Sequence, residues 1–132
     1  MSFNKSGTGI WILRIIAAVI MLQTLFFKFT ASEESVYIFS QIGMEPWGRI
    51  GSGILELVAS VLILYPRTTA YGAVLGCGLM AGAIYFHFTK LGFAVMNDGG
   101  QLFIYALLVF ASCSALAVIY RKDILRLISL NF

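Results

Sequence analysis

The chain has 132 residues, of which 60% are hydrophobic and 11% are charged. A soluble domain usually carries about 25% charged and about 45–50% apolar residues, so this composition excludes an ordinary soluble domain. The net charge of +3 is small, and no run of Lys and Arg exceeds two residues, which excludes a nucleic-acid-binding surface. We therefore expect one small, all-α membrane domain over residues 1–132.

The first apolar stretch, about residues 8–29, is too long for the hydrophobic part of a signal peptide, and no small-residue cleavage motif follows it. We predict that it is a retained transmembrane helix. It carries three polar residues, Arg14, Gln23 and Lys28. Because side chains lean toward the N-terminus of their own helix, we expect Arg14 to extend its guanidinium group to the lipid head groups.

A polar segment, residues 30–45, follows the first span. Its Thr30-Ala31-Ser32-Glu33 sequence has the form of a capping box. Apolar residues then recur at helical spacing, at Val36, Phe39 and Ile42, and Gly43 is a suitable stop. These signals predict a short interfacial helix that partly covers the mouth of a helical bundle.

Three further spans are predicted at about residues 47–65, 69–88 and 101–120. The link between the first two of these is so short that they must be antiparallel neighbours. The span at 69–88 contains two Gly-x-x-x-Gly pairs, Gly72 with Gly76 and Gly78 with Gly82, and such pairs let membrane helices pack closely.

Two connecting segments also have clear patterns. Before the last span, Asn97-Asp98-Gly99-Gly100 is a turn sequence. After it, residues 123–130 set the apolar side chains of Ile124, Leu125, Leu127 and Ile128 against Arg126, which predicts a second interfacial helix.

The basic residues predict the orientation. Four spans place both termini on one side, and that side would carry six basic residues against three on the other. This excess favours cytoplasmic termini. The six are Lys5, Arg14, Arg67, Arg121, Lys122 and Arg126, and the three are Lys28, Arg49 and Lys90.

Glu56 is the middle residue of the span at 47–65, so it is placed near the centre of the bilayer. A charged residue there costs roughly 2.5–3.5 kcal/mol on insertion scales, and intramembrane ionisable residues usually have a function. Glu56 must therefore have a partner or keep its proton. Ligand binding, proton handling and an ion pair that defines the fold all satisfy this condition.

Helix geometry brings candidate partners toward Glu56. In antiparallel neighbours, the lean of the side chains directs Lys28 and His87 into the bilayer and Glu56 toward them. Arg49, Ser52 and Glu56 share one face of their helix. We predict a polar pocket, open to the outer leaflet, that is built from Gln23, Lys28, Arg49, Glu56 and His87. As alternatives, His87 is an interface residue, and Lys28 and Arg49 are anchors at the membrane surface.

The two cysteines, Cys77 and Cys113, both fall inside predicted spans. They form no C-x-x-C motif, and no Cys/His set has the spacing of a metal site. We expect two small buried side chains and no bound metal. A redox pair across two helices is the alternative.

Several short segments resemble the DoxX family of small bacterial membrane proteins. They are Arg14 and Lys28 in the first span, Gly43-Met44-Glu45-Pro46, Glu56-Leu57, the segment from Leu62 to Arg67, and the Gly/Met-rich third span that ends at His87. The resemblance covers about residues 8–120. It implies a four-helix bundle in the bacterial inner membrane. Members are linked to quinone-coupled sulfur oxidation or to membrane complexes that handle oxidative and thiol stress, and the wider superfamily includes proteins that escort other membrane proteins.

Three functions follow. The first is an accessory subunit of a larger membrane complex, without catalytic activity of its own, whose pocket binds a lipid-like or quinone ligand or a partner's segment. Its partners would be membrane lipids and other subunits, with no nucleic acid and no covalent cofactor. The second is a component of a quinone-linked oxidoreductase, with Glu56 and His87 as proton acceptor and donor. The third, a proton-coupled transporter, is disfavoured because four spans without an inverted repeat do not suit a monomeric transporter.

Overall fold

The computed structural model describes residues 7–65, 67–92, 99–122 and 124–125, and these residues form helices and connecting turns. The helices are α1 (Thr8–Phe29), α2 (Glu33–Gln41), α3 (Trp47–Leu64), α4 (Thr69–Phe86) and α5 (Gln101–Ile119), and a π-helical turn, η1 (His87–Leu91), continues α4. Four of these segments are long and apolar enough to cross a membrane, with α4 and η1 counted as one. The predicted all-α membrane bundle is confirmed.

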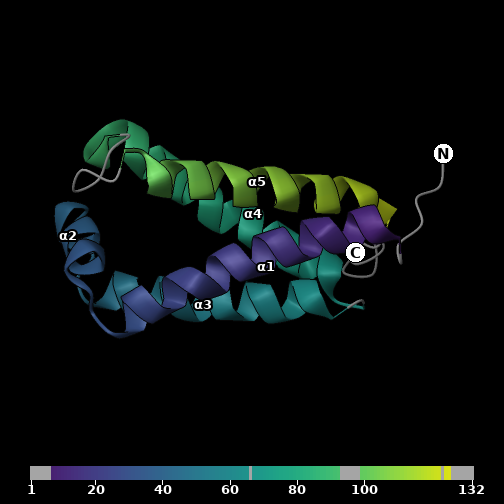
Figure 1. Ribbon diagram of the computed structural model, residues 1–132, viewed down its shortest axis with the longest axis horizontal. Coiled ribbons are helices and arrows are strands. Elements are labelled where there is room, and N and C mark those ends of the chain that lie inside the picture. Colours follow the sequence, from purple (N-terminus) through teal and green to yellow (C-terminus); the bar gives the residue numbers. More distant parts are fainter. Residues whose placement is uncertain (1–6, 66, 93–98, 123, 126–132) are drawn as a thin grey trace.

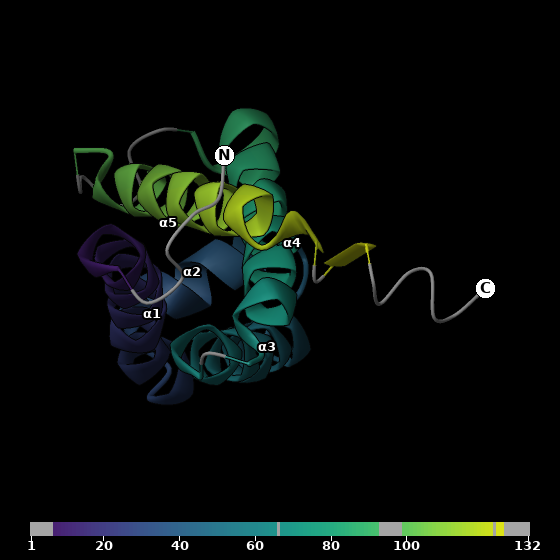
Figure 2. The same ribbon diagram turned by 90° about the vertical axis from the view of Figure 1, so that its right-hand side faces the viewer.

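The four long helices form an antiparallel ring. Both α1 and α4 pack against α3 and α5, so α1 and α4 lie on a diagonal. Figure 1 shows α2 across one end of the bundle, at the opposite end from the beginning of α1 and the end of α5. In the end view of Figure 2, α4 crosses from the α3 side to the α5 side. The helix α2 therefore occupies the predicted position over one end of the bundle.

The cap of α2 differs from the predicted capping box. Ser32 is the N-cap, and its hydroxyl oxygen accepts a hydrogen bond from the Ser35 N–H at 3.2 Å. Thr30 is instead the C-cap of α1, and its hydroxyl donates to the Phe26 carbonyl at 2.5 Å. The prediction placed the cap two residues too early because Thr30 ends α1 and two residues separate it from the first residue of α2.

Gly72 and Gly76 allow close helix packing, as predicted. A Cβ atom at Gly72 would lie 2.7 Å from the backbone nitrogen of Ile63 in α3. A Cβ atom at Gly76 would lie 2.6 Å from the Cys113 sulfur in α5. The same prediction is wrong for Gly78 and Gly82, because a Cβ atom at either position would meet nothing within 4 Å.

Arg14 lies inside the bundle, and the prediction that it reaches the head groups is wrong. Its side chain is fully buried. Nε donates to the Ile63 carbonyl at 2.9 Å and Nη2 donates to the Leu64 carbonyl at 2.5 Å, while the Trp11 ring lies 3.7 Å from the guanidinium carbon. The last carbonyls of a helix lack intrahelical partners and carry negative partial charge, so the C-terminus of α3 attracts this cation.

Some predictions concern residues outside the described ranges. Most of the amphipathic tail at 123–130 is among them, as are Asn97 and Asp98 of the predicted turn. The described half of that turn, Gly99 and Gly100, has positive φ angles of 70° and 88°, which glycine adopts readily.

Candidate ligand-binding site

Glu56 and Lys28 form an ion pair between adjacent helices. Glu56 lies on the inner face of α3 and is 5% exposed. Lys28, in the last turn of α1, places Nζ 2.5 Å from Glu56 Oε1. Each side chain leans toward the N-terminus of its own helix, as helix geometry predicts. Because α1 and α3 are antiparallel, Lys28 and Glu56 lean toward one another.

Polar neighbours surround both ends of the ion pair. The Thr24 hydroxyl donates to Glu56 Oε2 at 3.2 Å, or to the Met21 carbonyl at 2.8 Å. Lys28 Nζ also donates to Ser52 Oγ at 3.3 Å and lies 5.6 Å from the centre of the Phe39 ring. A buried ion pair compensates for its loss of hydration only when such additional partners are present.

Arg49 supports this pair from outside the site. Its Nε lies 3.0 Å from Glu45 Oε2, one helical turn earlier, and its Nη1 donates to the Lys28 carbonyl. Because these two partners use its guanidinium group, Arg49 does not line the cavity described next. Arg49 was predicted to line the pocket, and it instead positions the backbone of Lys28.

A cavity of about 440 Å³ lies beside the ion pair, at the end of the bundle that α2 covers. Gln23, Lys28, Glu56 and His87, four of the five predicted pocket residues, line it together. Most of the remaining wall is apolar. Polar side chains that were not predicted also contribute, and they are Thr24, Ser32, Glu34, Ser35, Ser52, Gln101 and Tyr105.

Several residues that line the cavity are also exposed. They are Gln23 and Phe27 of α1, Gln101 of α5, and Gly78 of the diagonal helix α4. Gly78 and Gly82 therefore widen the cavity, since no side chain fills the space beside them. Phe39 of α2 forms part of the cover.

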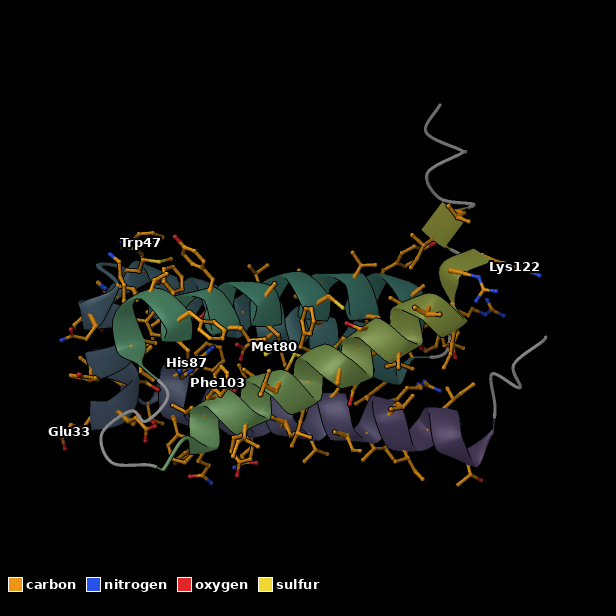
Figure 3. The ribbon with its side chains drawn as sticks, turned by 90° about the horizontal axis from the view of Figure 1, so that it is seen from above. Glu33, Trp47, Met80, His87, Phe103 and Lys122 are labelled. Atoms are coloured by element: carbon orange, nitrogen blue, oxygen red, sulfur yellow. The ribbon has the colours of Figure 1, made fainter. Side chains whose placement is uncertain are left out.

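His87 lies where α4 changes into the π-helical turn η1, and Figure 3 shows it beside Phe103. The two ring centres are 5.3 Å apart in an edge-to-face arrangement. His87 Nδ1 lies 2.8 Å from the Gly92 carbonyl oxygen. Single π-helical turns occur often at functional sites.

Comparison with known protein families gives one match. The family model described as the DoxX-like family matches residues 12–116, which is most of the chain. This chain belongs to the DoxX-like family. No curated protein and no solved structure matches it significantly.

The matched region of this DoxX-like protein contains both residues of the ion pair and every residue that lines the cavity, from Ile20 to Val109. Within the described residues, no group of three or more His, Cys, Asp and Glu side chains could hold a metal ion. Cys113 is buried and Cys77 is half-buried, and both are free thiols. The lining residues offer a ligand hydrogen bonds, the charges of the ion pair and an apolar surface.

Some of these additional lining residues could have been predicted from the sequence. Ser52, which shares the face of Glu56, lies four residues before it, and Thr24 lies four residues before Lys28. Helical residues at i and i+4 are neighbours, so both belong beside the ion pair. Gln101 and Tyr105 come from the last span, which carries no charged residue to mark its inner face.

Proposed function

We propose that this DoxX-like protein is a non-catalytic accessory subunit of a larger membrane complex, and that its cavity binds one lipid-like or quinone molecule. The observation that carries the proposal is an apolar cavity of about 440 Å³ with a buried ion pair, Lys28–Glu56, on its wall. Ligand sites commonly have volumes of about 300–1,000 Å³, apolar walls and a few convergent polar groups. An amphiphilic ligand matches both parts of this surface.

Access from the membrane supports a lipid-soluble ligand. Gly78 of α4 lines the cavity and is exposed, and α4 is apolar along its length. A ligand that is dissolved in the bilayer could therefore enter sideways between helices without crossing water.

A component of a quinone-linked oxidoreductase is the second candidate. Glu56 and His87 line the same cavity, and both are side chains that can exchange protons with a reduced or oxidised quinone. The electrons would come from another subunit of the complex. The two candidates share the same ligand pocket and differ in whether the ligand reacts there.

The exposed charges support cytoplasmic termini in a bacterial inner membrane. Arg14, Lys28 and Arg49 are engaged inside the protein, so they are poor indicators of orientation. Among the described residues, Arg67, Arg121 and Lys122 are exposed cations at the terminal end of the bundle, where α1 begins and α5 ends. Lys90 is exposed at the opposite end, which α2 covers. Figure 3 shows Glu33 and Lys122 at opposite ends of the bundle. This asymmetry favours the terminal end as the cytoplasmic one.

A matched pair of glycine variants tests ligand binding. Gly82 lines the cavity and Gly51 does not, and a Cβ atom at either glycine meets nothing within 4 Å, so we expect a leucine at position 82 to fill part of the cavity and one at position 51 to leave it unchanged. Both changes favour the helix. We expect at least tenfold weaker binding of a short-chain quinone and of a long-chain alcohol to Gly82→Leu, and unchanged binding to Gly51→Leu.

Binding is measured by native mass spectrometry on protein that is purified in mild detergent. Equal binding to the wild type and both variants would show that these probes do not use the cavity. Electron transfer to the quinone by the purified protein alone, lost in Glu56→Gln, would favour the enzyme component instead. Co-purification of the wild type with other membrane subunits would support the accessory role.

A further inference from the structure

The hydrogen bond between His87 and Gly92 determines which ring nitrogen carries the proton. A backbone carbonyl can only accept a hydrogen bond, so His87 Nδ1, at 2.8 Å from the Gly92 oxygen, must be the donor. In a neutral imidazole the other nitrogen, Nε2, then has no proton and is an acceptor. The positive φ of Gly92, 76°, belongs to the turn that returns this carbonyl to His87.

His87 Nε2 is accessible to a ligand. The described part of the chain contains no buried polar side-chain atom without a hydrogen-bond partner. Nε2 has no partner among the described residues, so it must lie on the small part of His87 that remains accessible. His87 also lines the cavity, so we take the cavity as the space in which this acceptor meets a ligand.

The ion pair adds a second acceptor and one donor to the same wall. Glu56 receives one hydrogen bond at each carboxylate oxygen, and each oxygen can accept another. Lys28 Nζ has three hydrogens and gives two of them to Glu56 and Ser52, which leaves one for a ligand. The most buried lining groups therefore suit a ligand that both donates and accepts.

We infer that the head group of the ligand is a hydroxyl, and that His87 Nε2 accepts its hydrogen bond. This inference rests on the proposed binding function and specifies the class of ligand. A hydroxyl donates to His87 and can still accept a hydrogen bond, whereas a ketone or an ether can only accept. Long-chain alcohols and the reduced, hydroxyl form of a quinone belong to the selected class.

Two probes with the same carbon skeleton test the inference. A long-chain secondary alcohol and the corresponding ketone differ only in the donor that His87 would recognise. A single hydrogen bond should make the alcohol bind about two- to tenfold more tightly to the wild type. In His87→Phe we expect equal binding of both probes. Equal binding of both probes to the wild type would overturn the inference.

Nitrogen NMR tests the same point without a substitution. His87 is the single histidine of the chain, so labelling with ¹⁵N-histidine reports on one imidazole ring. We expect a protonated Nδ1, an unprotonated Nε2, and a change at Nε2 when the alcohol is added but not the ketone. A proton on Nε2 in the neutral ring would overturn the inference.

The two proposals fail in different ways. If neither probe binds the wild type, the binding function fails and the inference fails with it. If both probes bind without a preference, or if the preference survives in His87→Phe, the cavity remains a binding site and the role of His87 is wrong.

Discussion

Lys28 of α1 and Glu56 of α3 are 28 residues apart in sequence, and each satisfies the charge of the other inside the bundle. The Glu56 side chain is 6% exposed and the Lys28 side chain is 14% exposed. Thr24 and Ser52 complete their hydrogen bonds. At this scale the pair contributes two things, a defined packing of α1 against α3 and a polar group on the wall of an apolar cavity.

Removing one partner should destabilise the protein because the other charge stays buried. We expect Lys28→Met to lower the free energy of unfolding by about 3–5 kcal/mol. Glu56→Gln should also destabilise, while the double variant should lose clearly less than the sum of the two single losses. Thermal or denaturant unfolding in detergent measures these changes.

Lys122→Met is the control for this prediction, because Lys122 is exposed at the end of the bundle. It should change the free energy of unfolding by no more than about 0.5 kcal/mol. Additive effects of Lys28→Met and Glu56→Gln would contradict the ion pair.

At the scale of helices, the glycines of α4 have two roles on two faces. Gly72 and Gly76 lie where α3 and α5 come close, and Gly78 and Gly82 lie beside the cavity. The end of the bundle near Arg14 is therefore tightly packed, while the end near α2 encloses space. Arg14 contributes to the tight end by donating to two terminal carbonyls of α3.

Alanine at two of these glycines should have opposite effects. In Gly72→Ala the new Cβ atom would lie 2.7 Å from the backbone of Ile63, so α3 and α4 must move apart, at a cost of about 1–3 kcal/mol. In Gly78→Ala it meets nothing, and the higher helix propensity of alanine should stabilise α4 by up to about 1 kcal/mol. Unfolding in detergent distinguishes the two, and a similar loss in both variants would show that the two faces are not different.

The helices and the ion pair could be predicted from the sequence, because apolar length defines spans and the lean of side chains is a local property. The partners of Arg14 could not, since the carbonyls of Ile63 and Leu64 become available only where α3 ends against α1. The Gly-x-x-x-Gly pattern likewise cannot show which face meets a neighbour. That depends on how α4 crosses the bundle (Figure 2).

At the scale of the whole molecule, the four spans enclose the cavity only because they separate toward α2. No single segment of the sequence contains this property, so the cavity, its cover by Phe39 and the exclusion of Arg49 from its wall appear only in the folded chain. The polar wall, by contrast, was predicted in part, because Gln23, Lys28, Glu56 and His87 stand out as polar residues in apolar spans.

The most direct measurement is an experimental structure of the wild-type protein purified with its native lipids. The account predicts elongated non-protein density inside the cavity, with its polar end against Lys28, Glu56 or His87 and its apolar part against the apolar wall. A cavity that is filled by the protein's own side chains, or a Glu56 carboxylate that points into the lipid away from Lys28, would contradict it.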